Sequence, residues 1–240
     1  MNERQIYAVL TGDIVGSSRY SAEERKRILD VLKSALVDID HHWKGIIKAP
    51  FEIHRGDAFQ GILNQPEMSL HVAIWIRSRL RQLDSGSKRK RARSLDADAR
   101  VAIGIGTVDS AAIVAEGQGE AFWHSGRTLE RMEGEKRLLV KTPWPDVNDE
   151  LEAEAGLLEA IMLRWTPRHA EVIGSLIPDL KRRQKDVADE LGISQSAVAQ
   201  RARQARWRAV QRLCLRFTRI IKMKLDPAGK EQGSRGDPDG

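Results

Sequence analysis

Apolar positions follow two different periods along the first 140 residues, and these periods predict a mixture of strands and helices. Short apolar runs at 6–10, 51–54, 58–63, 100–106 and 137–141 are typical of strands. Between them, apolar residues recur at helical spacing at 21–40, 68–83 and 120–131. The predicted order is strand–helix–strand–strand–helix–strand–helix–strand. Its first six elements are those of a ferredoxin-like split unit.

Local signals fix the ends of two of these elements. Ser21 precedes the first predicted helix and Glu24 follows three residues later, which is the pattern of a capping box. Gly56 and Asp57 separate the second and third predicted strands, which indicates a hairpin with glycine at its turn.

Beyond residue 142 the apolar positions follow helical spacing only. We expect a linker at 143–148, helices from 149 to 225 and a disordered tail at 226–240, where Pro, Gly, Ser and charge dominate. The predicted fold class is therefore α+β. It comprises a sheet-containing domain at 1–142, a connecting segment at 143–163 and an all-α domain at 164–225.

The last part of the all-α segment contains a long apolar stripe. No Gly or Pro occurs between Ile193 and Asp226, so the pattern predicts one unbroken helix from Ser194 to Leu225. Its apolar positions between Val210 and Ile221 either pack on the first domain or pair with a second chain.

Residues 184–198 have the pattern of a helix-turn-helix. Gly192 suits the left-handed turn and Ser194 suits the cap of the second helix. In that helix Val198, Ala202 and Ala205 share the inward face. The candidate DNA contacts are Gln195, Ser196, Ala199, Gln200 and Arg203 on the opposite face, with Arg201, Arg206 and Arg208 available to phosphates.

Charge supports a polyanion as partner of this segment. The 240 residues include 40 Lys+Arg and 34 Asp+Glu, a net charge of +6. Residues 164–224 alone hold 15 basic and 5 acidic residues. Such a local excess suits double-stranded DNA, although a solvated helix face is the alternative. A second basic run at 88–93 is either an exposed loop or a polyanion-binding arm.

Other features exclude several classes of protein. Cys214 is the single cysteine, which excludes a disulfide within the chain and a cysteine-based zinc site. No apolar stretch approaches the roughly 20 residues of a membrane span, and no signal peptide is evident. We therefore expect a cytoplasmic protein without a membrane partner.

Two aspartates stand where the predicted sheet would bring them together. Asp13 ends the first strand and Asp57 lies in the hairpin turn. Neighbouring carboxylates need a counter-charge, commonly Mg²⁺ or Mn²⁺ that bridges nucleotide phosphates. Gly12 and Gly16 would let backbone N–H groups approach a phosphate. The alternative is that Asp13 and Asp57 only form turns.

These motifs carry a family resemblance. The run from Asp13 to Ser17, then Gly56-Asp57, then 100–105 and 119–129 resemble class III nucleotidyl cyclases, and still more the SatD-like proteins. The resemblance implies metal on Asp13, Asp57 and the backbone carbonyl of Ile14. It implies a nucleotide beside Gly12, Gly16, Ser17 and Gly56, and a catalytic role for Arg127. Residues 166–213 resemble the DNA-binding domain of sigma-factor region 4.

Two positions depart from the cyclase pattern. Trp123 stands where cyclases carry an asparagine, and Ile53 stands where they carry the lysine that selects the base. We therefore predict a DNA-binding transcriptional regulator whose cyclase-like domain binds a nucleotide with divalent metal. The rival is a metal-dependent nucleotidyl cyclase or nucleotidyltransferase. Because cyclases build composite sites across dimers, the resemblance also implies a homodimer.

Overall fold

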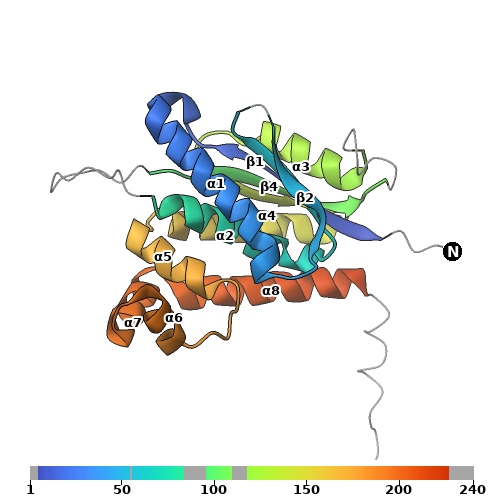
Figure 1. The fold of residues 1–240 in the computed structure, drawn as a ribbon. Coiled ribbons are helices and arrows are strands. Elements are labelled where there is room, and N and C mark those ends of the chain that lie inside the picture. The colour runs from blue at the N-terminus through green and yellow to red at the C-terminus, as the bar shows by residue number, and fades with distance from the viewer. Residues whose placement is uncertain (1–4, 55, 84–95, 110–117, 227–240) are drawn as a thin grey trace, which may run out of the picture.

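A five-stranded mixed sheet forms the centre of the protein (Figure 1). The structure, a computed structural model, describes residues 5–54, 56–83, 96–109 and 118–226. The strands are β1 (Ile6–Ile14), β2 (Ile47–His54), β3 (Ala58–Leu63), β4 (Ala99–Thr107) and β5 (Leu138–Lys141), in the spatial order β2-β3-β1-β4-β5. β1 pairs antiparallel with β3 and β4, while β4 and β5 run parallel. The first strand therefore lies beside the hairpin, as the sequence predicts.

Helices cover both faces of the sheet. α1 (Ala22–His42) and α2 (Ser69–Arg81) pack with alternate residues of β1 in the main apolar core. α3 (Glu120–Glu130) lies on the opposite face, where Ala121 packs against Tyr7 and Val9. Gly104 permits this close approach, because a Cβ at that position would lie 2.1 Å from the Ala121 carbonyl oxygen. The element order through β5 and the capping box of Ser21 and Glu24 are confirmed.

The C-terminal helices extend the same core beyond the α1–α2 layer. They are α4 (Pro145–Met162), α5 (Pro167–Leu176), α6 (Gln184–Leu191), α7 (Gln195–Gln204) and α8 (Trp207–Leu225). α5 packs on α2, and α8 runs alongside the short helix η2 (Pro66–Met68) (Figure 1). One cluster of buried apolar residues continues from β1 to Ile221. The chain is therefore mixed α+β, and its sheet and C-terminal helices share the main apolar core.

The helical segment differs from its predicted outline at three places. α4 begins at Pro145, so the predicted linker at 143–148 is mostly helix, with proline at a position that a first turn accepts. Residues 177–183 interrupt the predicted helical run. Arg206 separates α7 from α8 with a φ of 59°, so the predicted unbroken helix from Ser194 to Leu225 is wrong.

The apolar stripe on α8 packs within its own chain. Val210, Phe217, Ile220 and Ile221 are buried in the main core, and the Thr218 hydroxyl donates a hydrogen bond to the Glu67 carbonyl at 3.2 Å. The first of the two alternatives for this stripe is therefore correct. It is not free to form a dimer interface.

Two predicted segments fall outside the described residues. They are the basic run at 88–93 and, apart from Asp226, the predicted tail at 226–240. Within the ranges that the structure describes, no helix is long and apolar enough to cross a membrane.

Candidate functional sites

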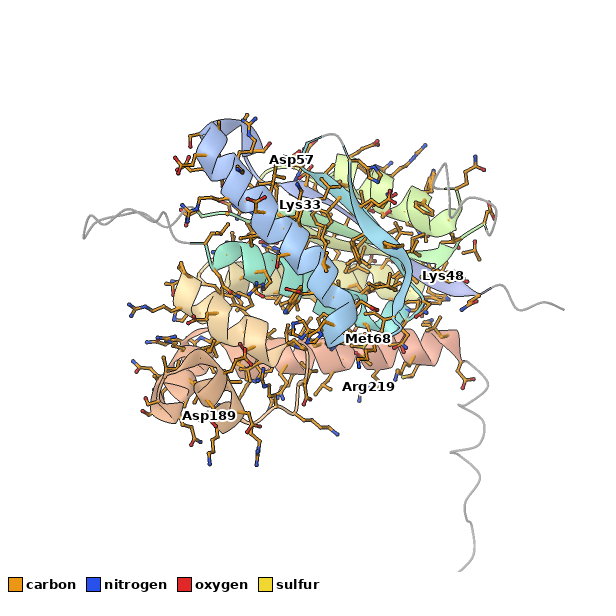
Figure 2. The ribbon with its side chains drawn as sticks, viewed as in Figure 1. Lys33, Lys48, Asp57, Met68, Asp189 and Arg219 are labelled. Atoms are coloured by element: carbon orange, nitrogen blue, oxygen red, sulfur yellow. The ribbon has the colours of Figure 1, made fainter. Side chains whose placement is uncertain are left out.

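Asp13 and Asp57 lie at the same end of the sheet, and Arg100 of β4 contacts Asp13 there. Asp13 pairs with Arg100 across β1 and β4, and Asp57 precedes β3 in the hairpin turn labelled in Figure 2. Arg100 Nε and Nη2 donate to the two carboxylate oxygens of Asp13 at 2.8 and 2.5 Å. The hydrogen bond to Asp13 and the charges of Asp13 and Asp57 raise the pKa of Arg100. Both carboxylates therefore act on one guanidinium.

Arg100 occupies the place at which a metal would meet Asp13. Each carboxylate oxygen of Asp13 already accepts a hydrogen bond from Arg100, whose Nη1 also donates to the Met132 carbonyl at 3.1 Å. Among the residues that the structure describes, no group of three or more His, Cys, Asp or Glu side chains could hold a metal ion. A divalent ion on Asp13 would therefore compete with the Arg100 guanidinium for the same two oxygens. No local sequence pattern identifies Arg100 as the counter-charge of Asp13.

The predicted phosphate-binding glycines occupy different environments. A Cβ on Gly12 would lie 2.5 Å from both the Phe59 ring and the Arg100 carbonyl, so packing alone requires glycine there. Gly16 (φ 64°) caps the short helix that begins at Ser17, and Gly56 (φ 92°) forms the hairpin turn with open space around it. The Ile14 side chain is buried in the core, at 5% exposure. Gly16 and Ser17 therefore border Asp13, while Gly12 lies within the sheet.

A chain of hydrogen bonds connects the sheet to α3 near these residues. Gln60 Nε2 donates to the Thr11 hydroxyl at 2.9 Å, and Thr11 donates to the Ser125 hydroxyl at 3.0 Å. Ser125 in turn donates to the Phe122 carbonyl at 3.1 Å. The Thr11 and Ser125 hydroxyls each donate within this series of hydrogen bonds. The series therefore fixes α3 to the sheet.

Arg127 is exposed on α3 and stacks on Trp123. Its guanidinium lies 4.7 Å from the centre of the Trp123 ring, and 54% of Trp123 is exposed. The Trp123 ring therefore holds the Arg127 guanidinium in place through a cation–π contact. An asparagine at position 123, as in cyclases, could not provide that support.

The α6–α7 pair has the local geometry that the sequence predicts. Gly192 ends α6 in the left-handed conformation (φ 63°), and the Ser194 side chain accepts a hydrogen bond from the Ala197 N–H at 3.2 Å. Val198, Ala202 and Ala205 are buried. Of the predicted DNA contacts, Gln195, Ser196, Gln200, Arg203 and Arg206 are exposed and Ala199 is half-buried. Ser196 shares a hydrogen bond with Ser194 at 2.9 Å.

The basic residues of this segment divide into paired and unpaired groups. Arg201, predicted as a phosphate contact, instead pairs with Glu171 of α5 at 2.8 Å. Arg182 pairs with Glu190, and Arg183 with Asp186. Within the described part of the chain, no ion-pair partner is found for the following arginines: Arg164, Arg168, Arg203, Arg206, Arg208 and Arg212.

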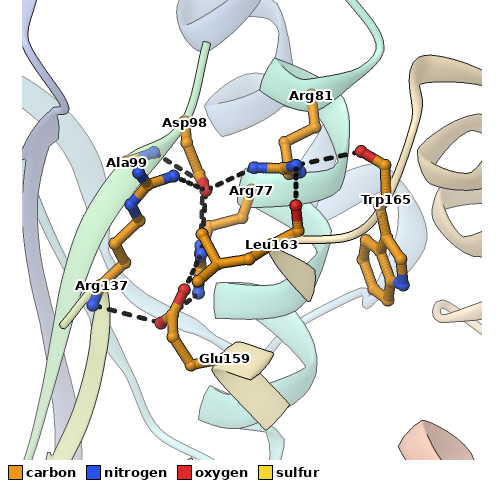
Figure 3. A network of polar contacts seen from close by, with 8 residues as sticks. All are labelled: Arg77, Arg81, Asp98, Ala99, Arg137, Glu159, Leu163 and Trp165. Carbon is orange, nitrogen blue, oxygen red and sulfur yellow. Dashed lines mark hydrogen bonds and ion pairs between the residues drawn. The ribbon is translucent and has the colours of Figure 1, made fainter. Parts of the chain in front are cut away.

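A buried ionic cluster, which the sequence did not predict, joins the sheet to the C-terminal helices (Figure 3). Arg77 of α2 donates to Asp98 at 2.9 Å and to Glu159 of α4 at 2.8 Å. Arg81 and Arg137 also donate to Asp98, at 2.9 and 3.0 Å. Burial would raise the pKa of Asp98, but the arginines hold it well below its usual range. The sequence signal was the presence of Arg77 and Arg81 in a largely apolar helix.

A known protein family matches most of the chain. The fold defines a mixed α+β protein in which sheet and C-terminal helices share one core. The model of the SatD family matches residues 7–216, so the chain belongs to the SatD family. The match spans both the sheet and the α6–α7 pair. A search of curated proteins found no match.

Proposed function

We propose that this SatD protein binds double-stranded DNA and regulates transcription, with α6 and α7 as a helix-turn-helix. The observation that carries this proposal is the outward face of α7. Gln195 and Gln200 are exposed near its beginning and Arg203 near its end, while the opposite face is buried. Exposed amides suit adenine edges in a major groove, and unpaired arginines suit guanine or phosphate.

The charge around α7 supports the same proposal. Residues 164–224 have 15 basic and 5 acidic residues, and several of the arginines lack an ion-pair partner in the described residues. Leaving arginines unpaired on one surface creates the positive field that attracts DNA phosphates.

A binding experiment with the full chain tests this function. Fluorescence anisotropy with a selected duplex at low salt should show binding that weakens as salt rises. Arg203→Gln should reduce affinity, whereas Arg25→Gln, the same charge change on the exposed start of α1, should reduce it far less. Gln200→Ala should change sequence preference by roughly 1–3 kcal/mol at one base pair. Equal weakening by Arg203→Gln and Arg25→Gln, or no duplex binding at all, would contradict the proposal.

For the sheet-containing part, the proposal remains a ferredoxin-like, cyclase-like domain that binds a nucleotide. Mg²⁺ or Mn²⁺ would accompany the nucleotide by displacing Arg100 from at least one oxygen of Asp13. The rival function is a metal-dependent nucleotidyl cyclase or nucleotidyltransferase. The placement of Asp13 and Asp57 at one end of the sheet supports that rival, whereas the contact of Arg100 with Asp13 opposes it. Incubation with Mn²⁺ and each nucleoside triphosphate tests it. New nucleotide products that disappear in Asp13→Asn would establish an enzyme.

A further inference from the structure

A groove runs between α4 and α8, next to the end of α7. Its volume is about 930 Å³, which is within the range of small-molecule sites. Apolar side chains from both helices line it, including Leu157, Ile161 and Leu213. Leu157 of α4 is 68% exposed. A large apolar side chain left open in a groove is typical of a binding surface.

The walls of this groove carry an excess of positive charge. Arg164, Arg206 and Arg212 line it, and each lacks an ion-pair partner among the residues that the structure describes. Arg216 also lines the groove but pairs with Glu150. Three free guanidiniums along an apolar surface suit a ligand that combines phosphates with an apolar body.

One acidic group lines the same groove. The Oε2 atom of Glu154 is buried and has no hydrogen-bond partner in the structure. Burial, and then the neighbouring charge of Glu150, raise the pKa of Glu154. A buried acceptor without a donor costs free energy, which the Glu154 side chain would recover by turning toward N–H donors of a ligand in the groove.

We propose that the α4–α8 groove binds a guanine nucleotide. The base lies on Leu157 and Leu213, Glu154 accepts from the ring N–H and amino groups of guanine, and the phosphates meet Arg164, Arg206 and Arg212. Guanine presents two adjacent donors to one carboxylate, whereas adenine presents an amino group beside an acceptor nitrogen. A DNA backbone would use the arginines but would leave the apolar residues and Glu154 without contacts.

The position of the groove connects this ligand to DNA binding. Gln204, the last residue of α7, and Arg206, the residue between α7 and α8, both line the groove. A phosphate held between Arg206 and Arg164 would fix the direction in which α7 leaves α8. Nucleotide and DNA would then alter each other's affinity by the same factor. This consequence, unlike nucleotide binding itself, rests on the proposed function.

Calorimetric titration of the full chain with GTP and with ATP, in EDTA and without divalent metal, tests the proposal. We expect GTP to bind about tenfold more tightly than ATP, because only guanine satisfies Glu154 with two donors. Glu154→Gln should reduce that preference. The double variant Arg164→Gln/Arg212→Gln should weaken GTP binding at least about tenfold, since two charge-assisted contacts are lost.

Two matched variants separate this groove from other sites. Arg219→Gln removes an exposed charge from α8 away from the groove and should leave GTP affinity within about twofold. Asp13→Asn reports any GTP that is held at the sheet end instead. Absence of GTP binding at about 1 mM would overturn the proposal. Loss of binding in Asp13→Asn but not in the double variant would overturn it too, because the ligand would then belong to the sheet.

DNA binding distinguishes the remaining outcomes. If the double variant weakens duplex binding and the wild-type chain binds no GTP, the groove is a DNA-phosphate contact and the proposal is wrong. If GTP binds through the groove but the chain binds no duplex, the groove proposal stands and the proposed function fails. Circular dichroism of each variant verifies that the fold is retained.

Discussion

Two groups of arginines in this protein have opposite surroundings. Arg77, Arg81 and Arg137 lie around Asp98 and Glu159 between the sheet and α4, and the Arg77 and Asp98 side chains are both 0% exposed. The groove arginines, Arg164, Arg206 and Arg212, line a surface with no carboxylate paired to them in the described residues.

The difference shows what each group contributes. An unpaired charge cannot remain in the core, so every buried arginine is matched by hydrogen-bonded carboxylates. Burial alone would lower the pKa of Arg77, yet Asp98 and Glu159 raise it above its ordinary value. The guanidinium groups of the groove arginines stay hydrated, and their N–H groups remain available as hydrogen-bond donors. We infer that the buried group holds the helices on the sheet, while the groove group is available to a ligand.

Removal of the central carboxylate should have the largest effect on stability. Asp98 accepts from Arg77, Arg81, Arg137 and its neighbouring Ala99 N–H, so Asp98→Ala leaves several buried donors unpaired. We expect a loss of about 3–5 kcal/mol in the free energy of unfolding, measured by urea titration. Asp149→Ala, on the exposed side of α4, should change it by less than about 0.5 kcal/mol. A loss below about 1 kcal/mol for Asp98→Ala would show that the cluster does not hold the two parts together.

The buried cluster also marks the limit of prediction from sequence. Element order, the Ser21 cap and the turn at Gly192 follow from local periodicity and from residues with strong conformational preferences. Arg77 and Glu159 are 82 residues apart in the chain, and no local pattern relates them. Likewise, the pattern placed Asp13 near Asp57 but did not show that Arg100 takes both oxygens of Asp13.

The break at Arg206 was hidden for a related reason. Helix ends are predicted from Gly, Asn or Pro, and this end uses an arginine in the left-handed conformation instead. Burial of the stripe from Val210 to Ile221 against the first part of the chain requires α8 to turn away from α7. Tertiary packing, which the local sequence does not report, decides that turn.

His71 is a buried titratable side chain that, unlike the buried arginines, has no oppositely charged partner in the described part of the chain. It lies on α2 at 3% exposure, its Nδ1 has no hydrogen bond, and burial lowers its pKa to about 4. The unfolded chain takes up this proton near pH 6.5, so stability should fall as pH decreases from about 6.5 toward 4. Between pH 7 and 5 the loss from this group should be about 2 kcal/mol.

Urea titrations at pH 7, 6 and 5 measure that dependence. His71→Leu should remove most of the loss, because burial lowers the pKa of His71 to about 4; a smaller part should remain, since burial also lowers the pKa of His42. His41→Leu, at an exposed position at the end of α1, should leave the slope unchanged. If the slopes of wild type and His71→Leu coincide, His71 takes up its proton in the folded state without penalty.

Asp13→Asn distinguishes a metal site from an internal ion pair. If Asp13 and Asp57 only repelled each other, as the sequence suggested, this change would stabilise the protein. Because Arg100 donates to both oxygens of Asp13, we expect a loss of about 1–2 kcal/mol instead. Thermal unfolding without metal measures the sign. A gain in stability would show that Arg100 does not neutralise Asp13 in solution.

Arg206 gives the smallest expected effect and tests the groove group directly. Its φ of 59° costs an ordinary side chain roughly 1–2 kcal/mol, a strain that glycine avoids. Glycine also has more freedom in the unfolded chain, so Arg206→Gly should stabilise the protein by only about 0.5–1 kcal/mol. Arg206→Ala keeps the strain and should give no gain. Urea titration of the two variants measures this difference.

An arginine kept where glycine is more stable is expected at a functional position. Arg206→Gly should therefore raise the free energy of unfolding and lower the affinity for GTP. If Arg206→Gly and Arg206→Ala have the same stability, the strain argument is wrong.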